Sequence, residues 1–256
     1  SGSRVAVGAG GARGSGTEKG GDMLGQSHAI SGALLYAATA PFLPEALLGA
    51  QPRPSEVLVG TLLCAGAALL PDLDHHDATP AHLLGPLSRG LCRVVGRLCG
   101  GHRHATHSLL FVALTSWGTW MGVTRLGGGF TLGLTFVLFA LAARALHLHP
   151  PGRGLTAWVT SVGLAGVGTA TVAAWFTGIA VWLPYTVCLG TLSHLLGDCL
   201  TRRGAPLFWP CRRRFELVLI RRTGGKLETR FFVPVMTVAT FAALWFSAFA
   251  PRLATG

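Results

Sequence analysis

Long apolar segments dominate the chain, and polar or glycine-rich stretches separate them. Seven can be marked, at residues 28–50, 55–71, 107–124, 127–147, 155–177, 179–200 and 231–250. An apolar stretch of about 20 residues is long enough to cross the hydrocarbon core of a bilayer as an α-helix. Pro41 and Pro44 favour a kinked, re-entrant or partial span in the first segment. The pattern therefore predicts an all-α, polytopic transmembrane helical bundle with about six or seven spans.

Two polar segments carry patterns of their own. Residues 87–100 place apolar side chains on one helical face and arginines on another, namely Leu87, Leu91, Val94, Val95 and Leu98, and Arg89, Arg93 and Arg97. This spacing favours a short amphipathic helix on the inner leaflet over a helix on a soluble surface. Residues 215–222 and 226–233 are β-prone and flank Thr223-Gly224-Gly225, which predicts a small cytoplasmic β-hairpin.

The composition argues against an ordinary soluble domain. Only 12% of the 256 residues are charged, whereas soluble domains average about 25%. Residues 1–22 hold eight glycines and little to bury, which predicts a disordered N-terminal tail. Residues 23–256 then form a single membrane-embedded domain with polar loops at 72–106 and 201–230. The six cysteines form no CxxC pair, and we interpret them as free thiols.

Basic residues predict the orientation in the membrane. Eighteen of the 21 Lys and Arg residues fall in the tail, in the two long loops, and at the end of the fourth segment with its following loop. Because loops rich in Lys and Arg stay in the cytoplasm, the N-terminus and both long loops are expected there, on a multi-pass inner-membrane protein. The net charge of +11 reflects this asymmetry. No DNA-recognition pattern accompanies it, so the expected partners are membrane lipids rather than nucleic acid. The oligomeric state is left open.

Histidines and acidic residues gather at these same predicted cytoplasmic ends. The candidate metal ligands are His28, Asp72, Asp74, His75, His102, His107, His194 and Asp198. The charge count did not use histidine, so this convergence is independent evidence for one site. His194 and Asp198 are four residues apart and share a helix face. An imidazole or carboxylate inside a span is costly unless it is paired or metal-bound, which favours a functional role. His147 and His149 are interpreted as interface residues.

The donor types narrow the choice of metal. Mixed imidazole and carboxylate ligands suit zinc, manganese or iron better than magnesium. We therefore expect a divalent metal cofactor, with zinc the first choice and manganese the second. Eight candidate donors exceed the four of a structural zinc site, so one or two ions are predicted.

These motifs also carry a resemblance to a known family. They are Ser27-His28, Pro71-Asp72-Leu73-Asp74-His75, His102-Arg103 with Thr106-His107-Ser108, and His194-Leu195 with Asp198 and Thr201. In this order they resemble the YdjM-type family, a bacterial inner-membrane group described as metal-dependent hydrolases and as LexA-binding. The resemblance covers roughly residues 27–235. It implies hydrolysis, and the candidate catalytic residues are Asp72, Arg103, Thr106 and Ser108.

Three functions fit these residues. The first is a membrane-embedded metal-dependent hydrolase, in which Asp72 is a general base and Arg103 binds phosphate or stabilises charge on the leaving group. Its substrate is expected to be an amphiphile from the inner leaflet. A phospholipid or another phosphorylated lipid is the first choice, which would make the enzyme a phosphoesterase, and amide or ester lipids are left open. The second is a metal-ion transporter or sensor, which predicts ligands across the whole membrane. The third is a structural membrane protein stapled by its metal, which predicts a closed site.

Overall fold

The protein was analysed as a computed structural model, which describes residues 25–42, 52–150, 154–176, 178–211, 213–219 and 225–248. The predicted tail, residues 1–22, lies outside this part. The α-helices are α1 (Gly25–Thr39), α3 (Pro54–Ala67), α4 (Pro86–Leu98), α5 (Leu109–Leu126), α6 (Gly128–Ala145), α7 (Leu155–Trp175), α8 (Ile179–Cys199) and α9 (Val233–Ala248). Short turns are η1 (Ala40–Phe42), η2 (Pro71–Asp74), η3 (Thr79–His82), η4 (Ala105–His107) and η5 (Glu228–Phe232).

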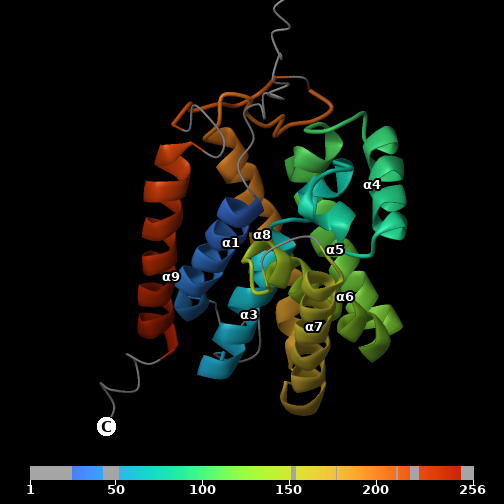
Figure 1. The fold of residues 1–256 in the computed structure, drawn as a ribbon, viewed down its shortest axis with the longest axis vertical. Coiled ribbons are helices and arrows are strands. Elements are labelled where there is room, and N and C mark those ends of the chain that lie inside the picture. The colour runs from blue at the N-terminus through green and yellow to red at the C-terminus, as the bar shows by residue number, and fades with distance from the viewer. Residues whose placement is uncertain are drawn as a thin grey trace, which may run out of the picture.

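The long helices form a bundle around α1, α3 and α8, which pack against one another (Figure 1). Helix α9 packs on α1, α6 packs between α3 and α7, and α5 packs on α8. The exposed face of α9 is apolar, with Val238 and Phe241 more than two-thirds exposed, as expected for a helix that contacts lipid. The turns η2, η3 and η4 lie with α4 towards one end of the bundle, and η2 and η4 hold two of the polar motifs (Figure 1).

Five of the described helical segments are long and apolar enough to cross a membrane: Pro54–Asp74, Gly128–Ala145, Leu155–Trp175, Ile179–Cys199 and Glu228–Ser247. The prediction of six or seven spans is therefore not supported. Helix α1 has only 15 residues, because it ends just before Pro41, and at 1.5 Å per residue it is too short to cross. Helix α5 has 18 residues but interleaves polar residues among its apolar ones and includes Arg125.

The predicted β-hairpin is wrong. Its second arm is helical, because residues 226 and 227 begin a helix that continues through the π-helical turn η5 into α9. The aromatic and β-branched residues that predicted this strand lie instead in a membrane helix. A single segment that crosses lipid must form its backbone hydrogen bonds internally, which favours a helix. In the first arm, Phe215 forms one isolated antiparallel bridge with Ala205. The turn residues Thr223 and Gly224 lie outside the described residues.

The predicted amphipathic helix is present as α4. Leu87, Leu91, Val94 and Leu98 form an exposed apolar stripe, and Leu98 is 82% exposed. The opposite side of the helix is held to the protein by Ser88, whose hydroxyl donates to the Ala81 carbonyl over 2.8 Å, and by the buried Cys92. All six cysteines are free thiols, as expected.

Two glycines let the central helices approach at their backbones. A Cβ on Gly190 of α8 would lie 2.6 Å from the Ala67 Cβ and 2.8 Å from the Cys64 carbonyl oxygen of α3. A Cβ on Gly32 of α1 would also lie 2.8 Å from that oxygen. Gly32 and Gly190 each lie four residues from a site histidine, His28 and His194. Close packing through small residues therefore brings both histidines to the end of α3.

We predict that Gly190→Ala lowers the free energy of unfolding by about 1–3 kcal/mol, because the new methyl group meets backbone atoms that cannot rotate away. The matched control is Gly163→Ala in α7, where a Cβ has no atom within 4 Å. The control is expected to be neutral or to stabilise by up to about 1 kcal/mol. Thermal unfolding in detergent compares the two, and equal midpoints would contradict the proposed packing.

Candidate metal centre

Four elements bring metal-binding side chains to one point. His28 comes from α1, Asp72 from η2, His107 from η4, and His194 and Asp198 from α8. Pro71 begins η2, where its fixed φ suits the first position of a turn. Ser108 is the N-cap of α5 and accepts a hydrogen bond from the Phe111 amide over 3.3 Å. This cap starts α5 directly after His107 and fixes the direction from which His107 enters the site.

The centre of the cluster consists of three buried donor atoms. The Nε2 atoms of His107 and His194 are 3.2 Å apart. Oδ2 of Asp198 is 3.3 Å from the first and 3.5 Å from the second. Asp72 adds a fourth donor, because its Oδ1 is 3.9 Å from His107 Nε2 and 3.8 Å from His194 Nε2. The side chains of His107, His194 and Asp198 are at most 1% exposed, whereas that of Asp72 is 16% exposed.

The three shorter distances fit ligands of a four-coordinate metal, and Asp72 lies farther from both imidazole nitrogens. Zinc binds nitrogen and oxygen ligands at about 2.0–2.1 Å, and in a tetrahedral site such bonds place the donor atoms about 3.3 Å from one another. Oδ2 of Asp198 is buried and has no hydrogen-bond donor among the described residues. A buried carboxylate oxygen facing two imidazole nitrogens without a donor is costly unless a cation completes the group. The residues present therefore fit a bound zinc-like ion.

His194 is held in the tautomer that a metal ligand needs. Its Nδ1 lies 2.7 Å from the Ala68 carbonyl oxygen, which accepts only a proton-bearing nitrogen as a partner. Nε2 is therefore left with its lone pair directed at the cluster. A hydrogen bond from the far ring nitrogen to a carbonyl is the usual support of a ligating histidine.

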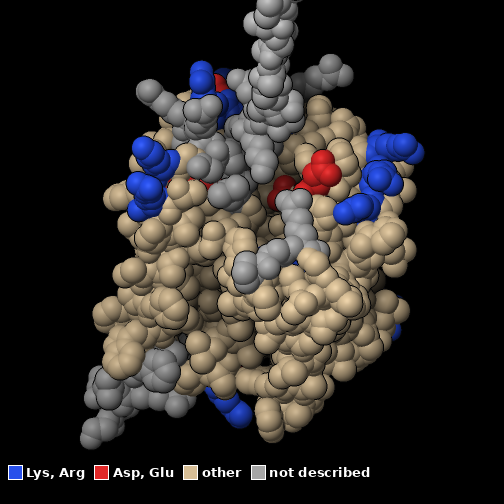
Figure 2. All heavy atoms as spheres, in the orientation of Figure 1, with Lys and Arg blue, Asp and Glu red and all other residues tan. Residues whose placement is uncertain are grey.

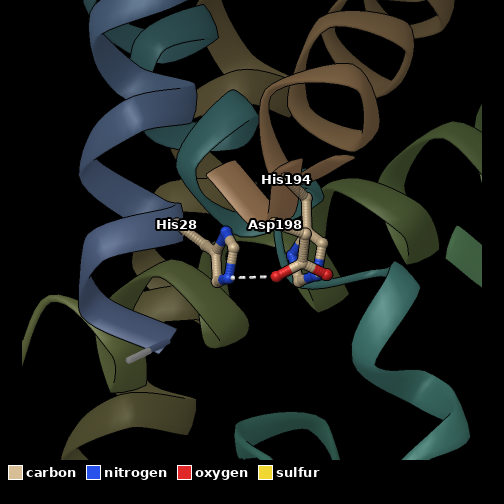
Figure 3. Close-up of side chains that lie close together, drawn as sticks. All are labelled: His28, His194 and Asp198. Atoms are coloured by element: carbon tan, nitrogen blue, oxygen red, sulfur yellow. Dashed lines mark ion pairs between the residues drawn. The ribbon is translucent and has the colours of Figure 1, made fainter. Parts of the chain in front are cut away.

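His28 extends the cluster on the other side of Asp198. Figure 3 shows its ring facing the Asp198 carboxylate, and Nε2 of His28 is 3.5 Å from Oδ1. The ring also stacks on His194, with centroids 3.8 Å apart and planes inclined by 15°. His28, His194 and Asp198 form one candidate metal-binding group, and Asp72, His107 and His194 form another.

Asp74 is the centre of a hydrogen-bond network around the ligands. It accepts from the Arg103 backbone amide over 3.0 Å, from the Thr106 hydroxyl, and from Nδ1 of His102 over 2.8 Å. Its Oδ2 is also 3.3 Å from Nδ1 of His107. Asp74, His102 and His107 make up the third candidate group. In this arrangement the carboxylate of Asp74 orients His107, as in carboxylate–histidine–metal triads, and Thr106 supports Asp74.

Arg103 binds inside the protein rather than facing a substrate. Its side chain is 3% exposed and pairs with Oδ1 of Asp198. It also donates to the Thr201 hydroxyl over 3.1 Å and to the Gly204 carbonyl over 3.4 Å. The backbone of Arg103 has a φ of 60°, a conformation that residues other than glycine rarely adopt. This strained turn points the guanidinium at Asp198 while the amide binds Asp74.

The remaining predicted residues lie at the edge of the site. His75 is half-buried, its ring packs edge-on against His102 with centroids 4.7 Å apart, and it belongs to none of the three candidate groups. Burial and the neighbouring His102 lower the pKa of His75. Ser108 donates to the Ala105 carbonyl over 2.6 Å, so its hydroxyl is engaged within the turn. His147 and His149 lie outside the three groups.

Glu228 is a site residue that sequence reasoning missed. It is fully buried in η5, and its Oε1 accepts a hydrogen bond from the Ser27 hydroxyl over 2.5 Å, beside His28. In the predicted hairpin Glu228 falls in the second arm, residues 226–233. The available signal was a carboxylate at the start of an apolar segment, which is costly without a partner.

Arg103→Met is expected to destabilise chelator-treated protein by about 3–5 kcal/mol, because it leaves the Asp198 carboxylate buried without its guanidinium partner. Arg214→Met is the control, since Arg214 is exposed and contacts only backbone carbonyls in the described part of the chain. Thermal or SDS-induced unfolding measures both. A loss below about 1 kcal/mol for Arg103→Met would contradict the role assigned to this ion pair.

The comparisons with known proteins agree with the resemblance that the motifs predicted. A family model described as YdjM inner membrane protein matches residues 23–152 and 141–253. Two proteins named inner membrane protein YdjM, from Escherichia coli K12 and Shigella flexneri, are each 32% identical over 161 residues, covering 62% of this chain and 54% of the relative. The chain thus spans about half the length of the curated relatives it matches. No solved structure matches. This chain is a membrane protein that belongs to the YdjM inner membrane protein family.

Proposed function

We propose that the protein is a membrane-embedded metal-dependent hydrolase that acts on phosphorylated lipids. The observation that carries the proposal is the trio of His107 Nε2, His194 Nε2 and Asp198 Oδ2, buried together with separations of 3.2–3.5 Å. The unpartnered oxygen of Asp198 supports a resident cation. Asp72, the only one of the four central donors that is partly exposed, supports access for water and substrate.

The hydrogen bonds favour one ion over two. His194 uses Nδ1 for the Ala68 carbonyl, so its single remaining lone pair can bind only one metal, although His194 belongs to two of the candidate groups. In the third candidate group, Nδ1 of His102 and Nδ1 of His107 both contact the Asp74 carboxylate. We therefore interpret this group as hydrogen-bond support for His107 and not as a second metal site. We propose zinc as the ion, with manganese as the second choice, because two imidazoles and a carboxylate match its ligand preference.

Each residue then has a distinct task. When bound, the ion supplies Lewis acidity towards a phosphoryl oxygen and lowers the pKa of a water molecule. Asp72 would accept the proton of the attacking water at a carboxylate oxygen, because it is the partly exposed carboxylate nearest the two imidazoles. Arg103 holds Asp198, and Asp74 with Thr106 holds His107. These residues act as positioning groups and keep the donors in place before the reaction.

The proposed substrate follows from where the charges lie. Figure 2 shows most of the Lys and Arg surface at the end of the molecule that carries α4 and the short turns, with less at the other end. We place this end in the cytoplasm, because cytoplasmic regions of membrane proteins are enriched in Lys and Arg. A site at the cytoplasmic end of the bundle would be accessible to an amphiphile from the inner leaflet. Metal ions and arginines both bind phosphate groups well, which favours a phosphorylated lipid.

Metal content tests the donor assignment. We expect elemental analysis to find about one zinc or manganese ion per wild-type chain, and none in His194→Ala or Asp198→Asn. Asp74→Ala is expected to bind the ion about 10–100-fold more weakly, because it removes support for His107 and not a ligand. His149→Ala is the control and is expected to retain the metal. Wild-type protein that carries no metal, when purified without chelator, would overturn the proposal.

Turnover tests the reaction. Metal-loaded protein in mixed micelles is expected to release phosphate or a phosphorylated headgroup from short-chain phospholipids, and chelation is expected to abolish this release. Asp72→Asn is expected to lower kcat by about 100-fold or more while the three closer donors retain the ion. Metal retention without turnover on phosphatidate or phosphatidylglycerol would favour the structural, metal-stapled protein instead.

A further inference from the structure

A cavity of about 560 Å³ lies beside the candidate metal centre, between η2, α4 and the glycine loop after α4. Its lining includes Asp74, His75, His76, Arg93, Arg97 and His102. The volume falls in the usual range for small-molecule sites, about 300–1,000 Å³. Asp74 and His102 belong to both the cavity wall and the hydrogen-bond network of the centre, so the two sites share part of a wall.

The cavity wall is rich in groups that bind anions. Arg93 and Arg97 are four residues apart on α4, so both guanidinium groups project from the same side of the helix. Neither has a carboxylate partner within the described residues. Three imidazoles add further polar groups. The one carboxylate in the wall, Asp74, already accepts hydrogen bonds from the Arg103 amide, the Thr106 hydroxyl and His102.

Glycines shape this space. A Cβ on Gly96 would lie 2.6 Å from the Asp74 carbonyl oxygen, so only glycine allows α4 to pack this closely on η2. Gly100 and Gly101 have φ of 82° and 103°, and these conformations disfavour any side chain that would narrow the cavity. The close packing of α4 therefore leaves a cavity bordered by charge and by bare backbone.

The exposed apolar stripe of α4 indicates where the cavity lies relative to lipid. Leu87 and Leu98 are 72% and 82% exposed, and they face away from the buried side of the helix. A helix with an apolar stripe beside a basic stripe lies in the membrane interface, with its arginines at the level of the lipid headgroups. The blue surface on the α4 side in Figure 2 marks that basic stripe.

We propose that this cavity binds the phosphate group of the substrate through Arg93 and Arg97 and presents the adjoining bond to the metal centre. This inference rests on the proposed function and adds a binding subsite to it. It also moves the proposed phosphate contact from Arg103 to the two arginines of α4, because the Arg103 guanidinium is occupied by Asp198, Thr201 and Gly204. Exposed arginines without carboxylate partners can form the paired hydrogen bonds that phosphate favours.

The experiment measures binding and not turnover, so it is independent of hydrolysis. Detergent-solubilised, metal-loaded protein is titrated calorimetrically with a short-chain, non-hydrolysable phosphonate analogue of phosphatidate, with inorganic phosphate, and with the uncharged dihexanoylglycerol. Arg93→Gln and Arg97→Gln are compared with Arg89→Gln. Arg89 is the matched control, because it lies on the same stripe of α4 but lines a different cavity and contacts His82.

We expect Arg93→Gln and Arg97→Gln each to weaken phosphonate-lipid binding by about tenfold or more, and Arg89→Gln to change it by less than threefold. Arg93→Lys and Arg97→Lys are expected to recover part of the affinity. Tighter binding of the phosphonate lipid than of inorganic phosphate identifies a lipid headgroup as the source of the phosphate, and the reverse order identifies a soluble phosphate. Unchanged affinity in both Gln variants, or equal binding of dihexanoylglycerol, would overturn the subsite even if hydrolysis were observed.

Discussion

The buried carboxylate of Asp198 is the group on which the rest of the site depends. Removing such a charge from water costs several kcal/mol unless partners surround it. One of its oxygens is paired with Arg103, and the other faces His107 and His194 and has no hydrogen-bond donor in the described part of the chain. Arg103 reaches Asp198 from a turn whose backbone has a positive φ, and that turn is held in place by Asp74. Two buried carboxylates, Asp198 and Asp74, thus hold the turn at Arg103, which lies 95 residues before Asp198 in the sequence.

The histidines reach this carboxylate because the helices are unusually close. Gly32 and Gly190 let α1 and α8 pack against the same carbonyl at the end of α3. Association inside a bilayer gains little from hydrophobic burial, so helices pack tightly through small residues. Here the same tight packing brings His194 within 2.7 Å of the Ala68 carbonyl. The packing of α8 on α3 therefore both stabilises the bundle and orients the candidate donor His194.

The sequence predicted that the histidines and aspartates gather at one place and that the chain is a helical membrane protein, but it predicted neither the number of spans nor the contacts within the cluster. Polar residues at the ends of apolar segments are costly in lipid, so their convergence could be inferred without coordinates. The contacts of Asp74 and Arg103 could not be inferred from the sequence, because they are hydrogen bonds between residues far apart in the chain, such as Arg103 with Thr201. The hairpin was wrong because Phe231, Phe232 and Val233 are compatible with either a strand or a membrane helix. Glu228 was overlooked for the same reason.

The donors of the candidate centre are shared between the two halves of the chain. His28, Asp72 and His107 precede α6, whereas His194 and Asp198 belong to α8, which follows α7. During synthesis from the N-terminus, the first half therefore presents an incomplete set of donors until α8 has entered the membrane. An ion bound at the proposed centre would therefore mark a chain in which α8, the helix that supplies His194 and Asp198, has already been inserted and docked.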